Sequence, residues 1–193
     1  MKKLAILMIA SIVLTSCAPA IVAVPAAASV AYDERTLSTI YQDEGITHQA
    51  YGVIQDNDEL KDTNISVASI NNLVLLVGQV QTEKQKDLIY KKVSALPDVK
   101  KVYNQITVEK TTSALTQSND AWITTKVKAA MLAEIGLKSS QVKVLTENSV
   151  VYLLGIVSQK QATEAAKVAS KIKGVKKVVK LFQIKSEKIT TKE

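Results

Sequence analysis

The chain has 193 residues, a formal net charge of +7 at pH 7, and hydrophobic residues at 47% of its positions. It contains one histidine and one cysteine, and none of the HExxH, CxxC, GxSxG, P-loop or GxGxxG motifs that common metal, redox, acyl-transfer and nucleotide sites use. The composition therefore argues against an enzyme, and we expect no catalytic residues, no metal site and no cofactor. The histidine, His48, is interpreted as a helix-surface residue.

Residues 1–16 are predicted to be a signal peptide. Two lysines precede an apolar stretch at 4–14 that is too short to span a bilayer. The stretch ends in Leu14-Thr15-Ser16-Cys17, which resembles the bacterial lipobox. Cys17 has no other cysteine with which to form a disulfide within the chain, so we expect it to be lipidated. The alternative is an ordinary signal peptide that happens to be cut near a cysteine.

Residues 17–44 are predicted to be a flexible tether between the lipid and the folded part. Their apolar run is short and is interrupted by Pro25, so it does not read as a membrane span. Cys17 is followed by Ala18 rather than aspartate, which is similar to the sorting pattern of Gram-negative lipoproteins sent to the outer membrane. The expected location is the outer membrane, lipid-anchored and on its periplasmic face.

The remaining chain contains two copies of one unit with a period of 77 residues, the separation of Ile46 and Ile123, which we call the repeat spacing. Matching positions include Ile46 and Ile123, Leu60 and Leu137, Val67 and Val144, Asn71 and Asn148, Leu76 and Leu153, and Gly78 and Gly155. After Val80 the second copy is shorter by a single position, and Val99-Lys100-Lys101-Val102 then matches Val175-Lys176-Lys177-Val178. A repeat of this length indicates a duplicated small domain rather than a solenoid.

Each copy predicts the order helix, strand, strand, helix, strand. In the first copy these elements are expected at 45–57, 65–68, 73–78, 82–96 and 99–108. In the second copy they are expected at 121–135, 142–145, 150–155, 158–173 and 175–184. The central strands are apolar and rich in β-branched residues, as strands are.

Local signals support these boundaries. Asn71-Asn72 and Asn148-Ser149 suit a tight turn with left-handed backbone. Thr82 with Gln85, and Ser158 with Gln161, have the spacing of a capping box. Pro97 and Gly174 are expected to stop the second helix of each copy.

This order predicts an α+β fold, with two helices packed on one face of a three-stranded mixed sheet in each copy. We place the domains at 45–109 and 119–185, a linker at 110–118, and a tail at 186–193.

The two copies resemble the BON domain. The resemblance rests on the α-β-β-α-β order, on the strands that end in Leu-Val-Gly and Leu-Leu-Gly, and on the Asp/Gly-Val-Lys-Lys-Val segments after the second helices. Two such domains behind a lipobox are similar to the dual-BON outer-membrane lipoproteins of the DolP (YraP) group. Asn148-Ser149 lacks the glycine expected in that turn.

The resemblance implies a function without catalysis. In the DolP group the second domain binds anionic phospholipid, chiefly through its first helix, and the first domain packs against it without binding lipid. The group is implicated in envelope integrity and in accumulation at division sites. The expected partner is therefore a membrane that contains phosphatidylglycerol or cardiolipin, with an envelope protein as a further candidate partner.

The candidate site is the first helix of the second copy, within the amphipathic stretch from Asn119 to Leu132. Ile123, Val127 and Met131 form a core-facing stripe, while the only tryptophan and two lysines lie outside it. A large indole beside lysines is typical of a membrane-interface helix. The predicted phospholipid-binding residues are Trp122, Thr125, Lys126, Lys128, Ala129 and Leu132. The alternative is that Trp122 is packed beneath the second helix.

The two copies differ in net charge. Residues 46–109 contain seven lysines and eight acids, net −1, whereas residues 119–185 contain twelve lysines and four acids, net +8. The predicted export and the presence of Arg35 as the only arginine argue against nucleic acid as a partner. A second hypothesis is a stress-related periplasmic chaperone or adaptor, which would bind protein with little dependence on lipid charge.

Overall fold

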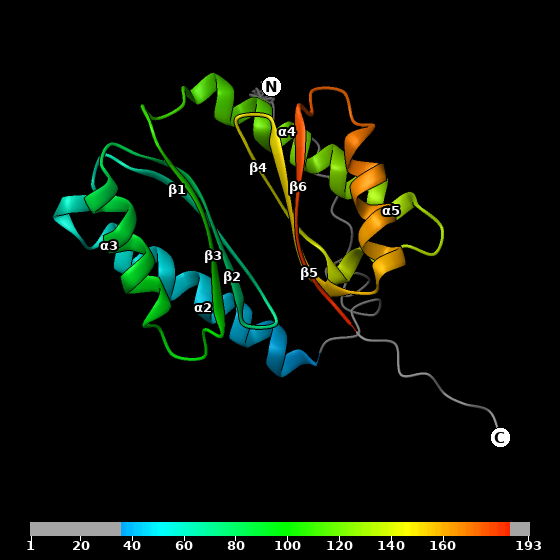
Figure 1. Ribbon diagram of the computed structural model, residues 1–193, viewed down its shortest axis with the longest axis horizontal. Coiled ribbons are helices and arrows are strands. Elements are labelled where there is room, and N and C mark those ends of the chain that lie inside the picture. Colours follow the sequence, from blue (N-terminus) through cyan, green and yellow to red (C-terminus); the bar gives the residue numbers. More distant parts are fainter. Residues whose placement is uncertain (1–35, 186–193) are drawn as a thin grey trace, which may run out of the picture. The chain divides into compact units, whose positions relative to one another are not determined.

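The computed structural model describes residues 36–185. The predicted signal peptide, Cys17, most of the predicted tether and the tail from 186 lie outside the described residues. The first copy comprises α2 (Leu37–Gln55), β1 (Asn64–Ile70), β2 (Leu73–Val80), α3 (Glu83–Ser94) and β3 (Lys101–Val108). The second comprises α4 (Ala114–Ala133), β4 (Lys143–Glu147), β5 (Val150–Val157), α5 (Gln159–Ser170) and β6 (Lys177–Ile184). The predicted α+β class and element order are confirmed (Figure 1).

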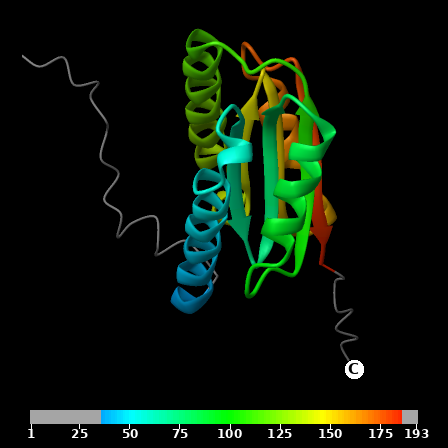
Figure 2. The same cartoon turned by 90° about the vertical axis from the view of Figure 1, so that its left-hand side faces the viewer.

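Each copy forms a three-stranded mixed sheet, in the order β1-β2-β3 and β4-β5-β6. The first two strands form an antiparallel hairpin, and the third strand returns parallel to the second after the second helix. Figure 2 shows α2 and α3 in front of the first sheet, so both helices cover the same face.

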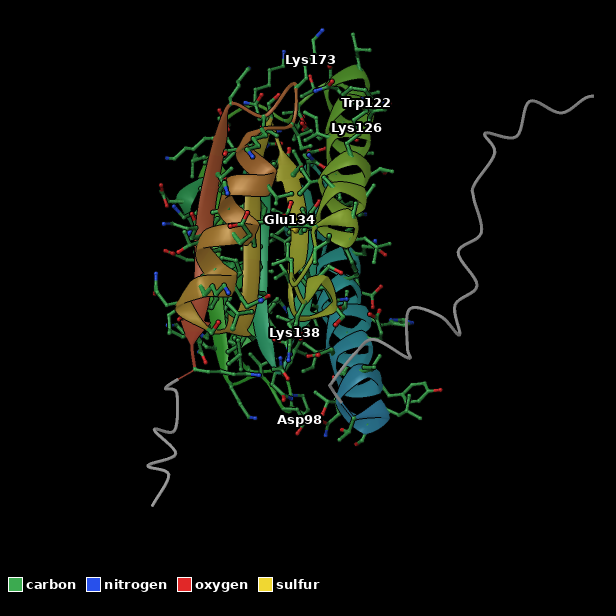
Figure 3. The ribbon with its side chains drawn as sticks, turned by 90° about the vertical axis from the view of Figure 1, so that its right-hand side faces the viewer. Asp98, Trp122, Lys126, Glu134, Lys138 and Lys173 are labelled. Atoms are coloured by element: carbon green, nitrogen blue, oxygen red, sulfur yellow. The ribbon has the colours of Figure 1, made fainter. Side chains whose placement is uncertain are left out.

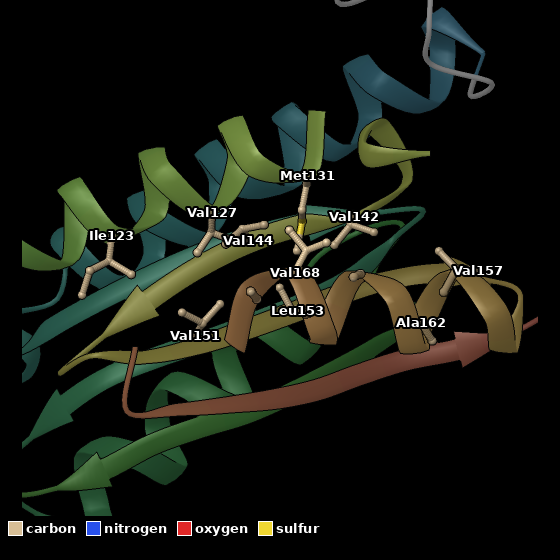
Figure 4. Packing of buried hydrophobic residues seen from close by; sticks show 12 residues of the cluster. Ile123, Val127, Met131, Val142, Val144, Val151, Leu153, Val157, Ala162 and Val168 are labelled. Carbon is tan, nitrogen blue, oxygen red and sulfur yellow. The ribbon is translucent and has the colours of Figure 1, made fainter. Parts of the chain in front are cut away.

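Each copy has its own apolar core between helices and sheet. In the second copy Ile123, Val127 and Met131 of α4 pack against strands β4 and β5 and against α5 (Figure 4). The equivalent core of the first copy contains Ile46 and Ala50 of α2. Burial of apolar surface at these positions is the main stabilising contribution to each copy.

The opposite faces of the two sheets pack together. A third buried cluster joins Ile70, Leu73, Leu75 and Val77 of the first copy to Tyr152 and Leu154 of the second. All eight residues of β2 are therefore buried, because its side chains face a helical layer on one side and the other sheet on the other. Among residues 36–185, none of the helices has the length and apolar character needed to cross a membrane.

Both first helices begin earlier than predicted. The hydroxyls of Thr36 and Ser113, which are related by the repeat spacing, cap α2 and α4 by accepting from the amides of Thr39 and Thr116. Residues 37–44, assigned to the tether, are therefore helical, and the predicted linker contains the first residues of α4. The apolar residues of these opening turns, such as Leu37 and Leu115, are exposed, and Asp43 and Asp120 interrupt the core-facing stripe before Ile46 and Ile123. The apolar pattern therefore located only the later part of each helix.

The hairpin turns have the predicted left-handed backbone, with φ of 53° and 65° at Asn71 and Asn72, and 50° and 65° at Asn148 and Ser149. The second turn adopts this conformation without a glycine. A buried carboxylate stabilises it: Asp120 of α4 accepts from the amides of Asn148 (2.7 Å) and Ser149 (2.8 Å). Asp43 of α2 holds the first turn in the same way.

The capping boxes are only half formed. Thr82 and Ser158 accept from the amides of Gln85 and Gln161, as predicted. The second hydrogen bond of a capping box, from the backbone amide of Thr82 or Ser158 to the glutamine side chain, does not form in either copy. The glutamine side chains bind other groups instead. The side chain of Gln161 accepts from the Lys138 amide (2.7 Å) and donates to the carbonyl of Gly136 (2.6 Å). It thereby fixes the turn that follows α4.

Candidate functional site

Helix α4 uses only one side of its circumference for the core. Ile123, Val127 and Met131 are completely or almost completely buried, at the spacing that places side chains on one face of a helix. The opposite face is exposed along the whole helix. We call this surface the outer face of α4; its residues are Leu115, Trp122, Thr125, Lys126, Ala129 and Leu132.

Large apolar side chains lie on the outer face. Trp122 is 47% exposed, Leu132 is 64% exposed, and Leu115, two turns before Trp122, is 81% exposed. Trp122 is thus not packed beneath α5, which decides the alternative left open by the sequence. Single exposed apolar residues are ordinary on a protein surface, and three of them on one helix, beside a lysine, make this face a candidate interaction surface.

Lys126 lies one turn after Trp122 and covers one side of the indole. Its Nζ is 3.8 Å from the ring centroid, within cation–π range, and both side chains lie at the same end of α4 (Figure 3). The contact holds a positive charge directly beside an exposed aromatic surface. Thr125 donates its hydroxyl proton to the carbonyl of Ala121 (3.0 Å), so this hydroxyl is already satisfied within the helix.

Lys128 is positioned differently from the other five predicted residues. It lies about 120° around the helix from Trp122, on the flank that faces Lys143. The Lys128 side chain is exposed, but neighbouring protein atoms displace part of its water and lower the pKa of Lys128, and the positive charge of Lys143 lowers it further. Lys143 itself pairs with Glu44 of α2 at 3.2 Å. The structure therefore brings Trp122 and Lys126 together and sets Lys128 apart from them.

Comparison with known proteins identifies the two copies. The BON domain matches residues 42–110 and 119–186. The chain belongs to the BON domain family. The two matched segments contain the first and second copies described above, which we now call the first and second BON domains.

Relatives share most of this two-domain chain. It is 40% identical over 185 residues to "Outer membrane lipoprotein DolP" of Haemophilus influenzae, covering 95% of this chain and 96% of that one. It is 35% identical to "21 kDa hemolysin" of Actinobacillus pleuropneumoniae, over 78% of each chain. It is 33% identical to "Osmotically-inducible protein Y" of Escherichia coli, over 70% of this chain and 69% of that one.

The first BON domain lacks the outer face that α4 presents. The repeat spacing relates the residues of the outer face to small or polar positions of α2: Ser38, Gly45, His48, Gln49, Gly52 and Gln55. The core positions, in contrast, stay apolar, as Ile46 and Ile123 or Ala50 and Val127 illustrate. The two domains thus share a core and differ at this surface.

Sequence reasoning missed two exposed residues near the site. Leu115 was missed because α4 was expected to begin at Ala121. The signal for the earlier start is Ser113, which caps α4 as Thr36 caps α2 in the first BON domain. Ile135 was expected at the helix end but lies beyond it, 98% exposed, in the turn held by Gln161.

Proposed function

We propose that this protein is a non-enzymatic, lipid-anchored outer-membrane protein whose second BON domain binds anionic phospholipid through the outer face of α4. Cys17 carries the anchor, and the folded part lies on the periplasmic side. In this role the protein supports envelope integrity, at division sites among other places. The relative named "Outer membrane lipoprotein DolP", similar over 96% of its length, supports the anchor and the location.

One observation carries the lipid-binding proposal: the half-exposed Trp122 with the Lys126 ammonium 3.8 Å over its ring. An indole partitions into the headgroup region of a bilayer, where its apolar ring and its N–H are both accommodated. The lysine meets lipid phosphate at the same depth. Leu115 and Leu132, exposed at the two ends of the same face, add apolar surface that enters beside the indole.

The magnitudes are sufficient for a tethered domain. Each lysine close to an anionic membrane contributes roughly 1 kcal/mol, and a buried leucine side chain contributes about 1.5–3 kcal/mol. Neither gives strong binding alone. Attachment through Cys17 keeps the domain near the membrane, which raises its effective concentration and makes weak contacts productive.

The test is vesicle flotation of residues 18–193, without the lipid anchor, on phosphatidylcholine vesicles with and without phosphatidylglycerol. We expect Trp122→Glu with Lys126→Glu to reduce binding to the anionic vesicles at least tenfold. The matched control is Tyr90→Glu with Lys91→Glu in α3 of the first BON domain, because Tyr90 is 45% exposed and the charge change is the same. Unchanged binding of the α4 variant would show that the site lies elsewhere.

A second candidate function is a stress-related chaperone or protein-interaction adaptor. It is favoured by the similarity to "Osmotically-inducible protein Y" and by the fully exposed Ile135. Under this hypothesis, binding to an unfolded protein substrate would survive the α4 substitutions and would be insensitive to lipid charge. Measuring substrate aggregation with the same two variants separates the candidates.

A further inference from the structure

A second lysine-rich element lies outside α4. The segment 171–177, which runs from the end of α5 to the first residue of β6, contains Lys171, Lys173, Lys176 and Lys177; we call it the basic loop. All four lysines are exposed. Within residues 36–185, none of the four forms an ion pair with a carboxylate. The loop therefore presents four positive charges to solvent within one short segment.

The fold itself does not require this charge. The equivalent segment of the first BON domain, 95–101, has Ala95 and Pro97 in place of Lys171 and Lys173, and Asp98 in place of Gly174. Both segments complete the same connection from the second helix to the third strand. The net charge of the segment is +1 in the first domain and +4 in the second. The added charge is therefore a property of this surface rather than of the BON fold.

The basic loop lies beside the Trp122 end of α4. A Cβ placed on Gly174 would be 3.1 Å from Cδ1 of Ile123, the residue after Trp122, so the loop backbone lies directly against this turn of the helix. Figure 3 shows Lys173 at the same end of α4 as Trp122, with Lys138 at the other end.

Hydrogen bonds fix this placement. The amide of Lys176 donates to the carbonyl of Ser149 (2.9 Å), and the amide of Ser149 donates to Asp120 of α4 (2.8 Å). Asp120 is 3% exposed, so its charge is used inside the domain and does not lie at the surface beside the lysines. The loop, the β4–β5 turn and the start of the Trp122 turn thus form one connected unit.

We propose that the basic loop is a second contact of this domain with anionic lipid, which binds headgroup phosphates next to the bilayer region that Trp122 enters. The proposal rests on the lipid-binding function proposed for α4. It assigns two roles to two elements: the outer face of α4 supplies apolar insertion and one lysine, and the basic loop supplies most of the charge. The occupant is the anionic surface of a bilayer.

The division of roles has a measurable consequence. On the outer face of α4 only Lys126 is positively charged, and one lysine changes membrane affinity about fivefold, from roughly 1 kcal/mol per lysine. The preference for anionic lipid should therefore depend mainly on the loop. Because exposed charges are screened by salt, the contribution of the loop should also fall as ionic strength rises.

The experiment compares two double variants of residues 18–193 on phosphatidylcholine vesicles with and without phosphatidylglycerol, at low and high salt. The first is Lys171→Gln with Lys173→Gln. The control is Lys160→Gln with Lys185→Gln, which removes the same charge at the other end of the domain. Lys160 lies about 16 Å along α5 from the loop, and Lys185 follows the last residue of β6, about 26 Å away. Circular dichroism checks that both variants remain folded.

We expect the loop variant to lose five- to 25-fold in binding to anionic vesicles at low salt, with a smaller loss at high salt, and the control to lose less than twofold. Equal losses in the two variants would overturn the proposal, because net charge rather than the loop would then explain them. An unchanged loop variant beside a defective Trp122→Glu/Lys126→Glu variant would overturn the loop contact and leave the α4 proposal intact. A defective loop variant beside an unaffected α4 variant would refute the α4 site and overturn the proposal in this form, because the loop would then bind lipid without insertion of Trp122.

Discussion

Removing the carboxylate of Asp120 tests how the second BON domain holds its hairpin turn. Asp120 is 3% exposed and accepts from the amides of Asn148 (2.7 Å) and Ser149 (2.8 Å). Both of these residues have positive φ, which costs roughly 1–2 kcal/mol for a residue with a side chain. The two hydrogen bonds keep the turn in this conformation, so Asp120→Ala should lower the free energy of unfolding.

The magnitude follows from the bonds lost. A hydrogen bond to a charged group contributes about 1.5–3 kcal/mol, and Asp120→Ala removes two and leaves the amides without their acceptor. Part of this loss is offset because a buried charge is no longer desolvated. We expect a net loss of about 2–4 kcal/mol, a large share of the roughly 5–15 kcal/mol typical of a folded protein. Asp120→Asn keeps one acceptor oxygen and should lose about half as much.

The assay is urea unfolding of residues 18–193, with Asp87→Ala as the control. Asp87 lies exposed on α3, and its substitution should change stability by less than about 0.5 kcal/mol. Asp43→Ala is the equivalent change in the first BON domain; Asp43 also accepts from the hydroxyl of Ser69 (2.8 Å), so its loss should be at least as large. If Asp120→Ala were as mild as Asp87→Ala, the turn would not depend on this carboxylate.

Three further predictions concern backbone and buried charge. Ser149→Gly should raise stability by about 0.5–1 kcal/mol in urea unfolding, because φ is 65° there and glycine adopts it freely; a loss of stability would contradict this. Gly155→Ala should lower the free energy of unfolding by at least about 2 kcal/mol, because the new Cβ would lie 2.2 Å from the Gln141 carbonyl oxygen. The control Gly52→Ala, at a position with open space, should be neutral or stabilising. Similar losses in the two variants would refute the packing argument. Burial raises the pKa of the Glu147 carboxyl above 4.5. The contribution of the protonated Glu147 carboxyl to the free energy of unfolding is therefore present below pH 4.5 and is lost as pH rises through the folded-state pKa. Glu147→Gln should remove this decline, and an identical pH profile for the two proteins would show that Glu147 does not cause it.

The element order was predictable because it depends on local signals that occur twice in the sequence. Apolar strands, turn residues and helix stops recur at matching positions of the two copies, and each copy checks the other. The helix starts were missed because the opening turns of α2 and α4 carry no core-facing apolar stripe: Leu37 and Leu115 are exposed, and Asp43 and Asp120 precede Ile46 and Ile123 on the stripe. Their caps, Thr36 and Ser113, are single hydroxyl residues, which become informative only once the repeat spacing is applied to them.

Packing of the first domain against the second was expected only through the family resemblance, and nothing in the sequence predicted that the two sheets form the contact. Residue spacing predicts which side chains share a face of a strand, but not which sheet covers that face. Glu147 shows the difficulty: its carboxylate accepts from Gln79 (2.8 Å) and Thr112 (3.3 Å) of the preceding copy and linker. These partners meet only after both sheets have formed and packed, so no local pattern indicates them.

The candidate site was partly predictable for a related reason. Trp122 and Lys126 are one turn apart, so helical periodicity alone places them together, and the structure adds the 3.8 Å contact. Lys128 also looked suitable, but its environment depends on Lys143, a residue of another element. The basic loop was visible only as charge in the total of the second copy, because its position at the Trp122 end of α4 depends on the packing of Gly174 against Ile123.

The two faces of the second sheet separate stability from the proposed binding. Tyr152 and Leu154 of β5 face the first BON domain, while Val151 and Leu153, the alternate residues of the same strand, face α4 and α5. The outer face of α4 lies on the side of that helix opposite the second core, and none of its residues belongs to the cluster that joins the two sheets. Contact with a membrane there requires no change in the packing between the domains. This face can therefore differ between the two domains, with Trp122 and Lys126 in the second where the first has Gly45 and Gln49, while the cores and the shared interface stay apolar.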